Sequence, residues 1–335
     1  MNNPKFLVIQ TAFTGDVILA TGLLQKLKQH YVNAEIDILV RKGNEELLFN
    51  NPFTNEVLIW NKKNKKIRNL FLLLKKIRRK KYTRVINLHR FLSTGILTAF
   101  SGADFTIGFE NNPLSFLFSK RIKHKKSDGE HYLHEIEKNH ELIKDFTDNQ
   151  PAKPFLYISE KEIAKTKEYT NGVYITIAPA SVWFTKQFPA KKWIEFIESL
   201  PIDVKVYLIG GPGDKLLADQ IISNIHSGIK LHNFCGALNF HESAALMKHA
   251  VMNYVNDSSP LHLASAINAP VTAIFCSTIP EFGFTPLSDR SFIIEIKSKL
   301  ECRPCGIHGK RSCPRKHFHC AQHISNDQLL ATLVV

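Results

Sequence analysis

Long apolar runs, a secretory leader and a disulfide framework are all missing from the sequence. The longest apolar run, residues 70–74, is far shorter than the ~18 residues that a helix needs to cross a bilayer. Residues 6–9 are too short for the apolar core of a secretory signal, and Asp16 follows soon after. The 6 cysteines are few for a chain of 335 residues, whereas small secreted proteins use dense disulfide frameworks. These absences favour a cytoplasmic protein whose contact with a membrane is peripheral.

Glycine is scarce in the first loop, which joins an apolar run at residues 5–10 to a helical pattern at residues 17–29. This loop, TAFTGD, has Gly15 as its single glycine. Dinucleotide-binding and Walker A loops need several glycines, because their backbone approaches phosphates closely, so both motifs are excluded. Asp16 falls in the first turn of the helix. Taken alone, it is most simply explained as an acid that suits the helix dipole.

The composition indicates a globular protein with excess positive charge. A hydrophobic share of 44% excludes a disordered or fibrous chain. Lys and Arg number 44 against 30 Asp and Glu, a net charge of +14. Residues 1–150 hold 25 basic and 15 acidic side chains, whereas residues 151–335 hold 19 and 15. The excess is therefore concentrated in the first half of the chain.

Strand-like and helix-like segments alternate twice along the chain, separated by a polar linker with prolines at residues 147–154. This alternation predicts parallel sheets covered on both faces. The predicted fold is α/β, with two Rossmann-like doubly wound domains, 1–150 and 151–335, that face a cleft. In the first domain, strands are predicted at 5–10, 35–40, 56–60, 84–88 and 105–108, and helices at 17–29, 67–79, 91–100 and 130–146. In the second domain, strands are predicted at 173–178, 204–210, 251–255 and 271–276, and helices at 190–199, 215–225, 239–249 and 261–267.

Two clusters of basic residues lie in the first half, at residues 62–81 and 120–126. The first has 11 Lys or Arg in 20 positions. Such a run is usually a solvated face, but two like-charged clusters in one domain repel each other and favour a polyanionic partner or an anionic membrane. Nucleic acid is disfavoured, because aromatic residues are not interleaved with the cations. The apolar positions with helical spacing predict one buried face, formed by Ile67, Leu70, Phe71, Leu74 and Ile77.

A strand-to-helix turn at residues 256–266 has the features of an anion site. Ser259 is a suitable N-cap, and Pro260 would then occupy the first helical position, where its missing N–H costs nothing. The free N–H groups of such a helix start face the carboxyl edge of the sheet, where α/β folds bind phosphates.

Several short motifs occur in one order along almost the whole chain. They are Thr14-Gly15-Asp16-Val17, Val85-Ile86-Asn87-Leu88 with Gly108-Phe109, His134-Glu135-Ile136-Glu137-Lys138-Asn139, Lys186-Gln187-Phe188-Pro189 with Trp193, Asn256-Asp257-Ser258-Ser259-Pro260-Leu261-His262, and Cys302-Arg303-Pro304-Cys305-Gly306. As a set these motifs resemble the bacterial lipopolysaccharide heptosyltransferases of glycosyltransferase family 9, and most of all the heptosyltransferase II type.

The resemblance implies a metal-independent, inverting transfer of heptose from ADP-heptose to the Kdo and heptose inner core of lipopolysaccharide. It also implies a GT-B fold, with the acceptor on the N-terminal domain and the donor on the C-terminal one. Inversion needs one base for the acceptor hydroxyl and stabilisation of the departing diphosphate. Two alternatives stay open: a transferase of the same fold with another nucleotide-sugar donor, and a non-catalytic protein that binds polyanions or membrane surfaces.

The resemblance assigns roles to individual residues. Asp16 matches the general base, and Lys186 matches a lysine that binds the donor phosphate and stabilises the leaving ADP. The simpler explanations are a loop lysine for Lys186, a turn residue for Asp257, a packed polar group for His262 and a capping residue for Asp214. The expected donor-binding residues are Thr185, Asp214, Asp257, Ser258, Ser259 and His262, and the expected acceptor-binding residues are Thr14, Gly15, Lys62, Lys66 and Arg121.

Four cysteines near the C-terminus, with three histidines among them, have the density of a metal site. Their spacing is imperfect for a common zinc module, so structural zinc is an alternative that we do not favour, and no cofactor is expected. Cys235 and Cys276 are predicted to be core residues. The cluster consists of Cys302, Cys305, Cys313 and Cys320, with His308, His317 and His319 nearby.

Overall fold

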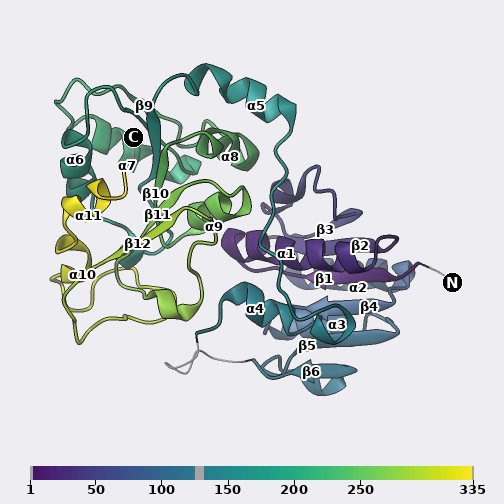
Figure 1. Ribbon diagram of the computed structural model, residues 1–335. Helices are drawn as coiled ribbons and strands as arrows, with labels where there is room; N and C mark the ends of the chain where they lie inside the picture. The colour runs from purple at the N-terminus through teal and green to yellow at the C-terminus, as the bar shows by residue number, and fades with distance from the viewer. Residues whose placement is uncertain (1–2, 125–131, 334–335) are drawn as a thin grey trace. The chain divides into compact units, whose positions relative to one another are not determined.

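The computed structural model describes residues 3–124 and 132–333 and forms two compact units, Met1–Tyr157 and Ile158–Val335 (Figure 1). Each unit is described by itself. The predicted linker at 147–154 lies inside the first unit, so the boundary follows Tyr157 rather than residue 150.

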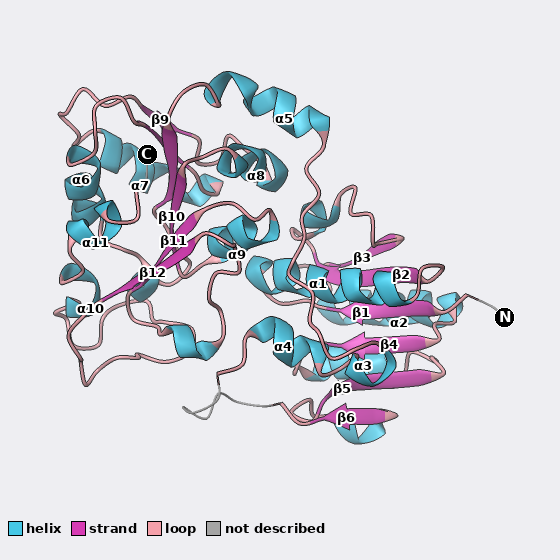
Figure 2. Ribbon diagram, viewed as in Figure 1, coloured by secondary structure: helices cyan, strands magenta, loops and turns pink. Residues whose placement is uncertain are grey.

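The first unit is a parallel sheet of six strands in the order β3-β2-β1-β4-β5-β6 (Figure 2). The strand order reverses between β1 and β4, which is the topological switch point where α/β sheets bind ligands. Helix α1 packs beside α4, and α2 packs beside α3. The strands are β1 (Lys5–Ile9), β2 (Glu35–Arg41), β3 (Glu56–Trp60), β4 (Arg84–Asn87), β5 (Phe105–Phe109) and β6 (Lys120–Ile122), and the helices are α1 (Thr14–His30), α2 (Lys66–Lys80), α3 (Leu92–Ala99) and α4 (Glu135–His140).

The second unit repeats the arrangement, with a parallel six-stranded sheet in the order β12-β11-β10-β7-β8-β9. Its switch point lies between β7 and β10. Its core includes the fully buried Trp193, Phe196 and Tyr254. The strands are β7 (Tyr174–Ala178), β8 (Lys205–Leu208), β9 (Leu231–Asn233), β10 (Met252–Asn256), β11 (Val271–Phe275) and β12 (Ser291–Glu295), and the helices are α5 (Glu160–Thr166), α6 (Ala190–Glu198), α7 (Lys215–Ile222), α8 (Phe240–Lys248), α9 (Ser259–Ala266), α10 (His319–Gln322) and α11 (Asn326–Leu330).

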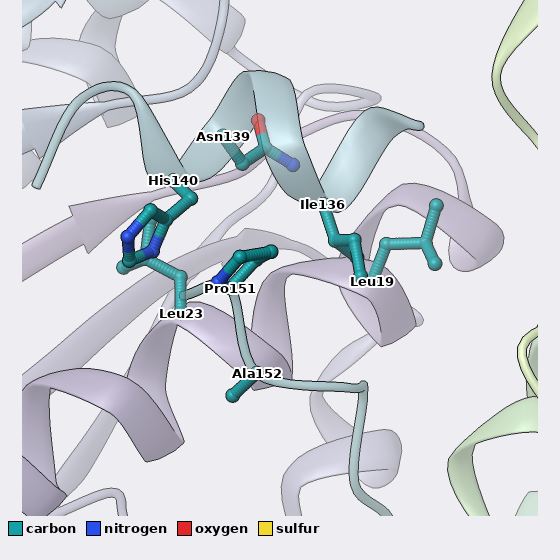
Figure 3. A pocket seen from close by; sticks show the side chains of 7 residues that line it. All are labelled: Leu19, Leu23, Ile136, Asn139, His140, Pro151 and Ala152. Carbon is teal, nitrogen blue, oxygen red and sulfur yellow. The ribbon is translucent and has the colours of Figure 1, made fainter. Parts of the chain in front are cut away.

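The segment predicted as a linker is bound to α1. Lys26 Nζ lies 3.1 Å from Asp148 Oδ2, and the Phe155 N–H donates to Thr21 Oγ1 at 2.8 Å. A side chain at Gly22 would collide with the backbone, because a Cβ there would lie 2.4 Å from the carbonyl oxygen of Ala152. The same segment lines a small cavity together with α1 and α4 (Figure 3). The lining residues are Leu19, Leu23, Ile136, Asn139, His140, Pro151 and Ala152.

Two helix predictions in the first unit are wrong in part. The helix predicted over 130–146 is a short α4 (Glu135–His140) followed by a 3₁₀ turn at Lys144–Phe146, and Glu130 lies outside the described residues. In α2 the buried stripe is Leu70, Leu73 and Ile77, and the stripe predicted through Ile67 and Phe71 leaves both side chains exposed.

Two further features differ from prediction. Helix α9 has Ser258 as its N-cap and begins at Ser259, so Pro260 takes the second helical position rather than the first. The basic cluster at 120–126 begins as the edge strand β6, whereas Lys125 and Lys126 lie outside the described residues. Within the described ranges, no helix combines the length and apolar character needed to cross a membrane.

Candidate active-site groups

The loop between β1 and α1 holds Asp16 at the switch point of the first sheet. The N–H of Phe13, the N-cap of α1, donates to Asp16 Oδ2 at 3.1 Å, so the carboxylate caps the start of the helix. The Thr14 hydroxyl donates to Asn44 Oδ1 at 3.2 Å, and the Asn44 amide donates to the Ala12 carbonyl at 3.2 Å. These hydrogen bonds to Asp16 and Asn44 fix the loop. The position of Asp16 is compatible both with the expected interaction with the helix dipole and with a role as a base.

Lys62 follows β3 and binds this loop directly. Its Nζ donates to the Thr11 carbonyl at 2.8 Å and to Thr11 Oγ1 at 3.0 Å, and it lies 4.7 Å from the centre of the Trp60 ring. Burial, followed by the positive charges of Arg41 and Lys66, lowers the pKa of Lys62 to about 8. Among the described residues no carboxylate forms an ion pair with Lys62, so this uncompensated cation would gain from a bound anion.

Arg41, at the end of β2, is a second cation at the loop that the sequence did not single out. Its guanidinium lies 4.9 Å from the centre of the Phe13 ring. Burial lowers the pKa of Arg41, while the Asp16 carboxylate opposes this change. The signal in the sequence is its position, because the residues that follow neighbouring parallel strands meet at one edge of the sheet.

Glu135 and His89 complete the group of titratable residues whose pKa values are shifted by these surroundings. Glu135 begins α4, its side chain is 16% exposed, and Lys138 Nζ lies 3.7 Å from its carboxylate. Burial raises the pKa of Glu135 to about 7; Lys138 opposes this effect and Asp16 adds to it. Burial lowers the pKa of His89 to about 4, with contributions from Lys62 and Arg90. Glu135 belongs to a motif of the resemblance, but the sequence analysis assigned no function to it.

The expected acceptor residues do not all meet at this loop. Thr14, Gly15 and Lys62 lie in or against it, and Lys66 begins α2 close enough to influence Lys62. Arg121 lies in β6, which is separated from β1 by β4 and β5. Three strand spacings of about 4.8 Å place it roughly 14 Å away from β1.

In the second unit, Lys186 and Asp257 form a largely buried ion pair. Lys186 Nζ lies 2.7 Å from Asp257 Oδ2, and the Lys186 and Asp257 side chains are 14% and 8% exposed. The Thr278 hydroxyl donates to the same carboxylate oxygen at 2.6 Å. The three residues follow the adjacent strands β7, β10 and β11, so the sheet itself brings them together.

The C-terminal segment fixes the loop that carries Lys186. The Lys310 N–H donates to Thr185 Oγ1 at 2.8 Å, the Thr185 N–H donates to the Lys310 carbonyl at 3.1 Å, and the Ser277 hydroxyl donates to Thr185 Oγ1 at 2.9 Å. Thr185 is buried. Its hydroxyl thus positions the loop from inside the unit, which differs from the donor contact expected from the sequence. A Cβ at Gly309 would lie 2.9 Å from Lys186 Cγ, so the segment also packs on the lysine.

Arg303 anchors this segment and was not singled out from the sequence. Its guanidinium donates to the carbonyls of Thr278 at 2.7 Å and of Cys276 at 2.8 Å, and it pairs with Glu295 at 2.6 Å. It therefore holds the backbone of Thr278, the residue whose hydroxyl binds Asp257. The available signal was its place between Cys302 and Cys305 in a motif of the resemblance.

The start of α9 has the helix-start geometry on which the predicted anion site depends. Its dipole favours negative charge at this end. Pro260 has no N–H, and the Leu261 N–H donates to the Ser258 carbonyl at 3.1 Å. The N–H groups of Ser258 and Ser259 are therefore the ones that a bound anion would meet. Ser258 adopts extended backbone as the N-cap, and its hydroxyl donates to the Asn256 carbonyl at 3.3 Å. The Asn256 side chain accepts from the Phe188 N–H at 2.8 Å and thereby ties the Lys186 loop to β10.

Two expected donor residues, Asp214 and His262, have contacts that fit the simpler structural explanations, and their donor roles stay predictions. Asp214 Oδ2 accepts from the Gly211 N–H at 2.8 Å, and Asp214 is the N-cap of α7, so it stabilises its own turn. His262 is buried within α9, and its ring centre lies 6.1 Å from that of Phe284.

The four C-terminal cysteines are free thiols that lie near one another. Cys305 Sγ donates to the Cys302 carbonyl at 3.3 Å, and burial raises the pKa of Cys320 to about 12, with Cys305 and Cys313 contributing. Across residues 3–124 and 132–333, no three metal-ligating side chains are arranged to hold a metal ion. The predicted core residues Cys235 and Cys276 are buried.

Comparison with known proteins gives consistent matches. The sequence profile of glycosyltransferase family 9 (heptosyltransferase) matches residues 70–316. Lipopolysaccharide heptosyltransferase 3 of Escherichia coli is 28% identical over 280 residues, covering 79% of this chain and 82% of the relative. Lipooligosaccharide heptosyltransferase 2 of Haemophilus influenzae is 23% identical over 314 residues, covering 87% and 88%. The solved structure of E. coli ADP-heptose LPS heptosyltransferase II matches with a TM-score of 0.80 at 22% identity, over 98% of this chain and 97% of that one, which shows the same GT-B fold.

Proposed function

Because the chain belongs to glycosyltransferase family 9, we propose that it is an inverting heptosyltransferase that transfers heptose from ADP-heptose to the Kdo and heptose inner core of lipopolysaccharide. The names of its relatives support the sugar and the lipopolysaccharide or lipooligosaccharide acceptor. Family membership also decides for an enzyme and against the non-catalytic alternative. The observation that carries the mechanism is the Asp16 carboxylate, held at the first switch point after a loop that Lys62 binds, and close enough to Arg41 to influence its pKa.

On the acceptor side, Asp16 acts as the general base. It takes the proton of the acceptor hydroxyl while the hydroxyl oxygen attacks the anomeric carbon of the heptose. The new C–O bond forms as the bond from the anomeric carbon to the phosphate oxygen breaks, and ADP leaves with that electron pair. Arg41, Lys62 and Lys66 bind the phosphates and carboxylates of the inner core, because the three positive charges lie close enough to influence one another and Lys62 is held against the loop without a carboxylate partner.

On the donor side, the N–H groups at the start of α9 and the Lys186 ammonium hold the diphosphate. Lys186 stabilises the negative charge that grows as ADP leaves, so the reaction needs no metal. The Lys186 ammonium also pairs with the Asp257 carboxylate, which accepts from the Thr278 hydroxyl. Asp257 and Thr278 thus keep Lys186 oriented for the diphosphate.

The location follows from the acceptor, which is a membrane lipid. We place the enzyme peripherally at the cytoplasmic surface of the inner membrane, where its basic first unit meets the anionic inner core. The excess of 10 positive charges in residues 1–150 supports this placement.

The deciding experiment is calorimetric titration of the purified protein with ADP, UDP and GDP, with and without a chelator. Selective ADP binding that survives the chelator is expected, followed by heptose transfer to isolated inner-core acceptor. Preference for another nucleotide would leave the family assignment intact and would show that the donor is a different nucleotide sugar. Loss of ADP binding or transfer in the chelator would overturn the metal-independent mechanism and reopen the zinc alternative at Cys302, Cys305, Cys313 and Cys320.

A further inference from the structure

Helix α2 exposes apolar side chains on the face turned away from the sheet. Leu70, Leu73 and Ile77 bury the opposite stripe. On the outer side, Phe71 and Leu72 are 60% and 56% exposed, and Ile67 at the start of the helix is 70% exposed. A helix whose outer face contacts only water would carry polar residues at these positions.

Three cations share this outer face. With about 100° of rotation per residue, Arg68, Lys75 and Arg79 fall with Phe71 and Leu72 inside an arc of roughly 100°. Within the described part of the chain, no ion pair involves Arg68, Lys75 or Arg79. The neighbouring lysines of α2 differ, because they turn toward β2 and β3: Lys76 pairs with Glu56, and Lys80 pairs with Asp37 and Glu56.

We propose that this outer face of α2, formed by Ile67, Arg68, Phe71, Leu72, Lys75 and Arg79, docks on an anionic lipid bilayer. A bilayer surface accepts both kinds of side chain at once, since aromatic and aliphatic groups enter the boundary of the acyl chains while cations meet the headgroups. Nucleic acid would match the cations but would leave the apolar residues without partners. The charge of the face, all of one sign, is complementary to anionic lipid.

The docking face adjoins the loop between β1 and α1, which leads to Asp16. Helix α2 begins at Lys66, four positions after Lys62, whose ammonium binds Thr11. A docked α2 would therefore hold the Asp16 loop near the headgroups, where a lipid acceptor presents its sugars. This gain for catalysis rests on the proposed function, whereas vesicle binding itself does not.

The test is sedimentation of the full chain with phosphatidylcholine vesicles that contain or lack phosphatidylglycerol, without donor or acceptor. The wild type is expected to bind the anionic vesicles only, and less tightly at high salt. Both the Phe71→Ser/Leu72→Ser variant and the Arg68→Gln/Lys75→Gln/Arg79→Gln variant should bind about tenfold or more weakly. Phe116→Ser is the matched control, because Phe116 is 66% exposed outside α2.

Calorimetric ADP binding and thermal unfolding of each variant verify that it is folded. The proposal is overturned if the wild type ignores anionic vesicles, if both α2 variants bind as the wild type does, or if Phe116→Ser loses as much affinity. If the protein binds nucleic acid but not vesicles, and Phe71→Ser/Leu72→Ser leaves that binding unchanged, the cations serve another polyanion and the proposal is overturned. A vesicle result of either sign leaves the nucleotide titrations unaffected, so the two proposals fail separately.

Discussion

Lys62 in the first unit and Lys186 in the second are both cations at the carboxyl edge of a parallel sheet, but their surroundings differ. Lys62 has the uncharged oxygens of Thr11 as partners and the positive charges of Arg41 and Lys66 nearby. Lys186 lies 2.7 Å from the carboxylate of Asp257. One cation lacks compensation, and the other is neutralised inside the protein.

We call Asp16, Arg41 and Lys62 of the first unit the first half-site, and Lys186, Asp257 and Thr278 of the second unit the second half-site. The two groups use their positive charge in different ways. A cation without a counter-ion gains from any anion that arrives, and it responds to pH because its protonation is costly. A cation with a buried counter-ion must exchange one partner for another, so its function depends on the groups that keep both partners in place. We therefore expect the first half-site to be sensitive to charge and the second to be sensitive to geometry.

The largest expected effect is the loss of the base from the first half-site. Asp16→Ala should lower the rate of heptose transfer about 10³-fold, because proton transfer in the transition state would lose its acceptor. ADP affinity should remain close to that of the wild type, since the donor groups are in the second unit. Steady-state transfer rates and ADP calorimetry measure the two quantities. Asp104→Ala, at an exposed acid of the same unit, is the control, and unchanged turnover in Asp16→Ala would remove the base assignment.

Removing the compensated cation should have the next largest effect. Lys186→Ala is expected to slow transfer about 10²-fold at saturating donor and to weaken ADP binding, because it leaves Asp257 buried without its partner as well as removing the positive charge. Lys191→Ala, at an exposed lysine of α6, should leave both quantities unchanged. A normal rate of Lys186→Ala at saturating donor would restrict this lysine to binding.

The geometry of the second half-site can be tested without changing any charge. Thr278→Val removes the hydroxyl that binds Asp257 at 2.6 Å and keeps the shape of the side chain. Turnover should fall about tenfold, because an unmade hydrogen bond to a buried carboxylate lets the pair with Lys186 move. Thr278→Ser keeps the hydroxyl and should recover most of the activity. If Thr278→Ser is as slow as Thr278→Val, packing of the methyl group rather than the hydrogen bond is responsible.

The central strands of the fold were predictable from sequence, and two of the missed strands have a common physical reason. β1, β4, β7 and β10 are buried along most of their length, which favours apolar residues in their sequences. β6 and β9 lie at sheet edges, are three residues long and are only partly buried, so their sequences carry no apolar run. β12 is also an edge strand, but its apolar residues 292–294 carried a signal that the prediction did not use. In α2 the helical spacing was correct, but the predicted face was displaced toward Ile67 and Phe71, because apolar residues occupy both sides of that helix.

The sequence predicted those residues of the candidate site whose own motifs indicate a chemical role. Asp16, Lys186 and Asp257 stood out through their motifs. Thr278 carried no such signal, because its importance lies in its contact with Asp257, which is distant in sequence. Arg303 lies in a motif of the resemblance, but its role depends on contacts with distant loops that the motif does not reveal. Arg41 and Glu135 were missed for the same reason, since only the packing of the first unit brings their charges under the influence of Asp16.

The smallest expected effect concerns the pH response of the uncompensated cation. The pKa of Lys62 is lowered to about 8, so this lysine loses its proton as the pH rises through about 8. A bound acceptor phosphate favours the protonated form and raises that pKa, so acceptor binding must take up a proton above pH 8. The KM for the acceptor should therefore rise severalfold between about pH 7.5 and pH 9.5 in the wild type. In Lys62→Met the KM should be higher at pH 7.5 and should lack this rise.

Lys66→Met separates this effect from general loss of charge. Removing Lys66 removes a repulsion that lowers the pKa of Lys62, so the rise in KM should move to higher pH, even though a cation has been lost. A general electrostatic effect predicts instead a higher KM at every pH with the same profile. The direction in which Lys66→Met moves the profile therefore decides whether Lys62 acts as the uncompensated cation of the first half-site or as one of many charges on a basic surface.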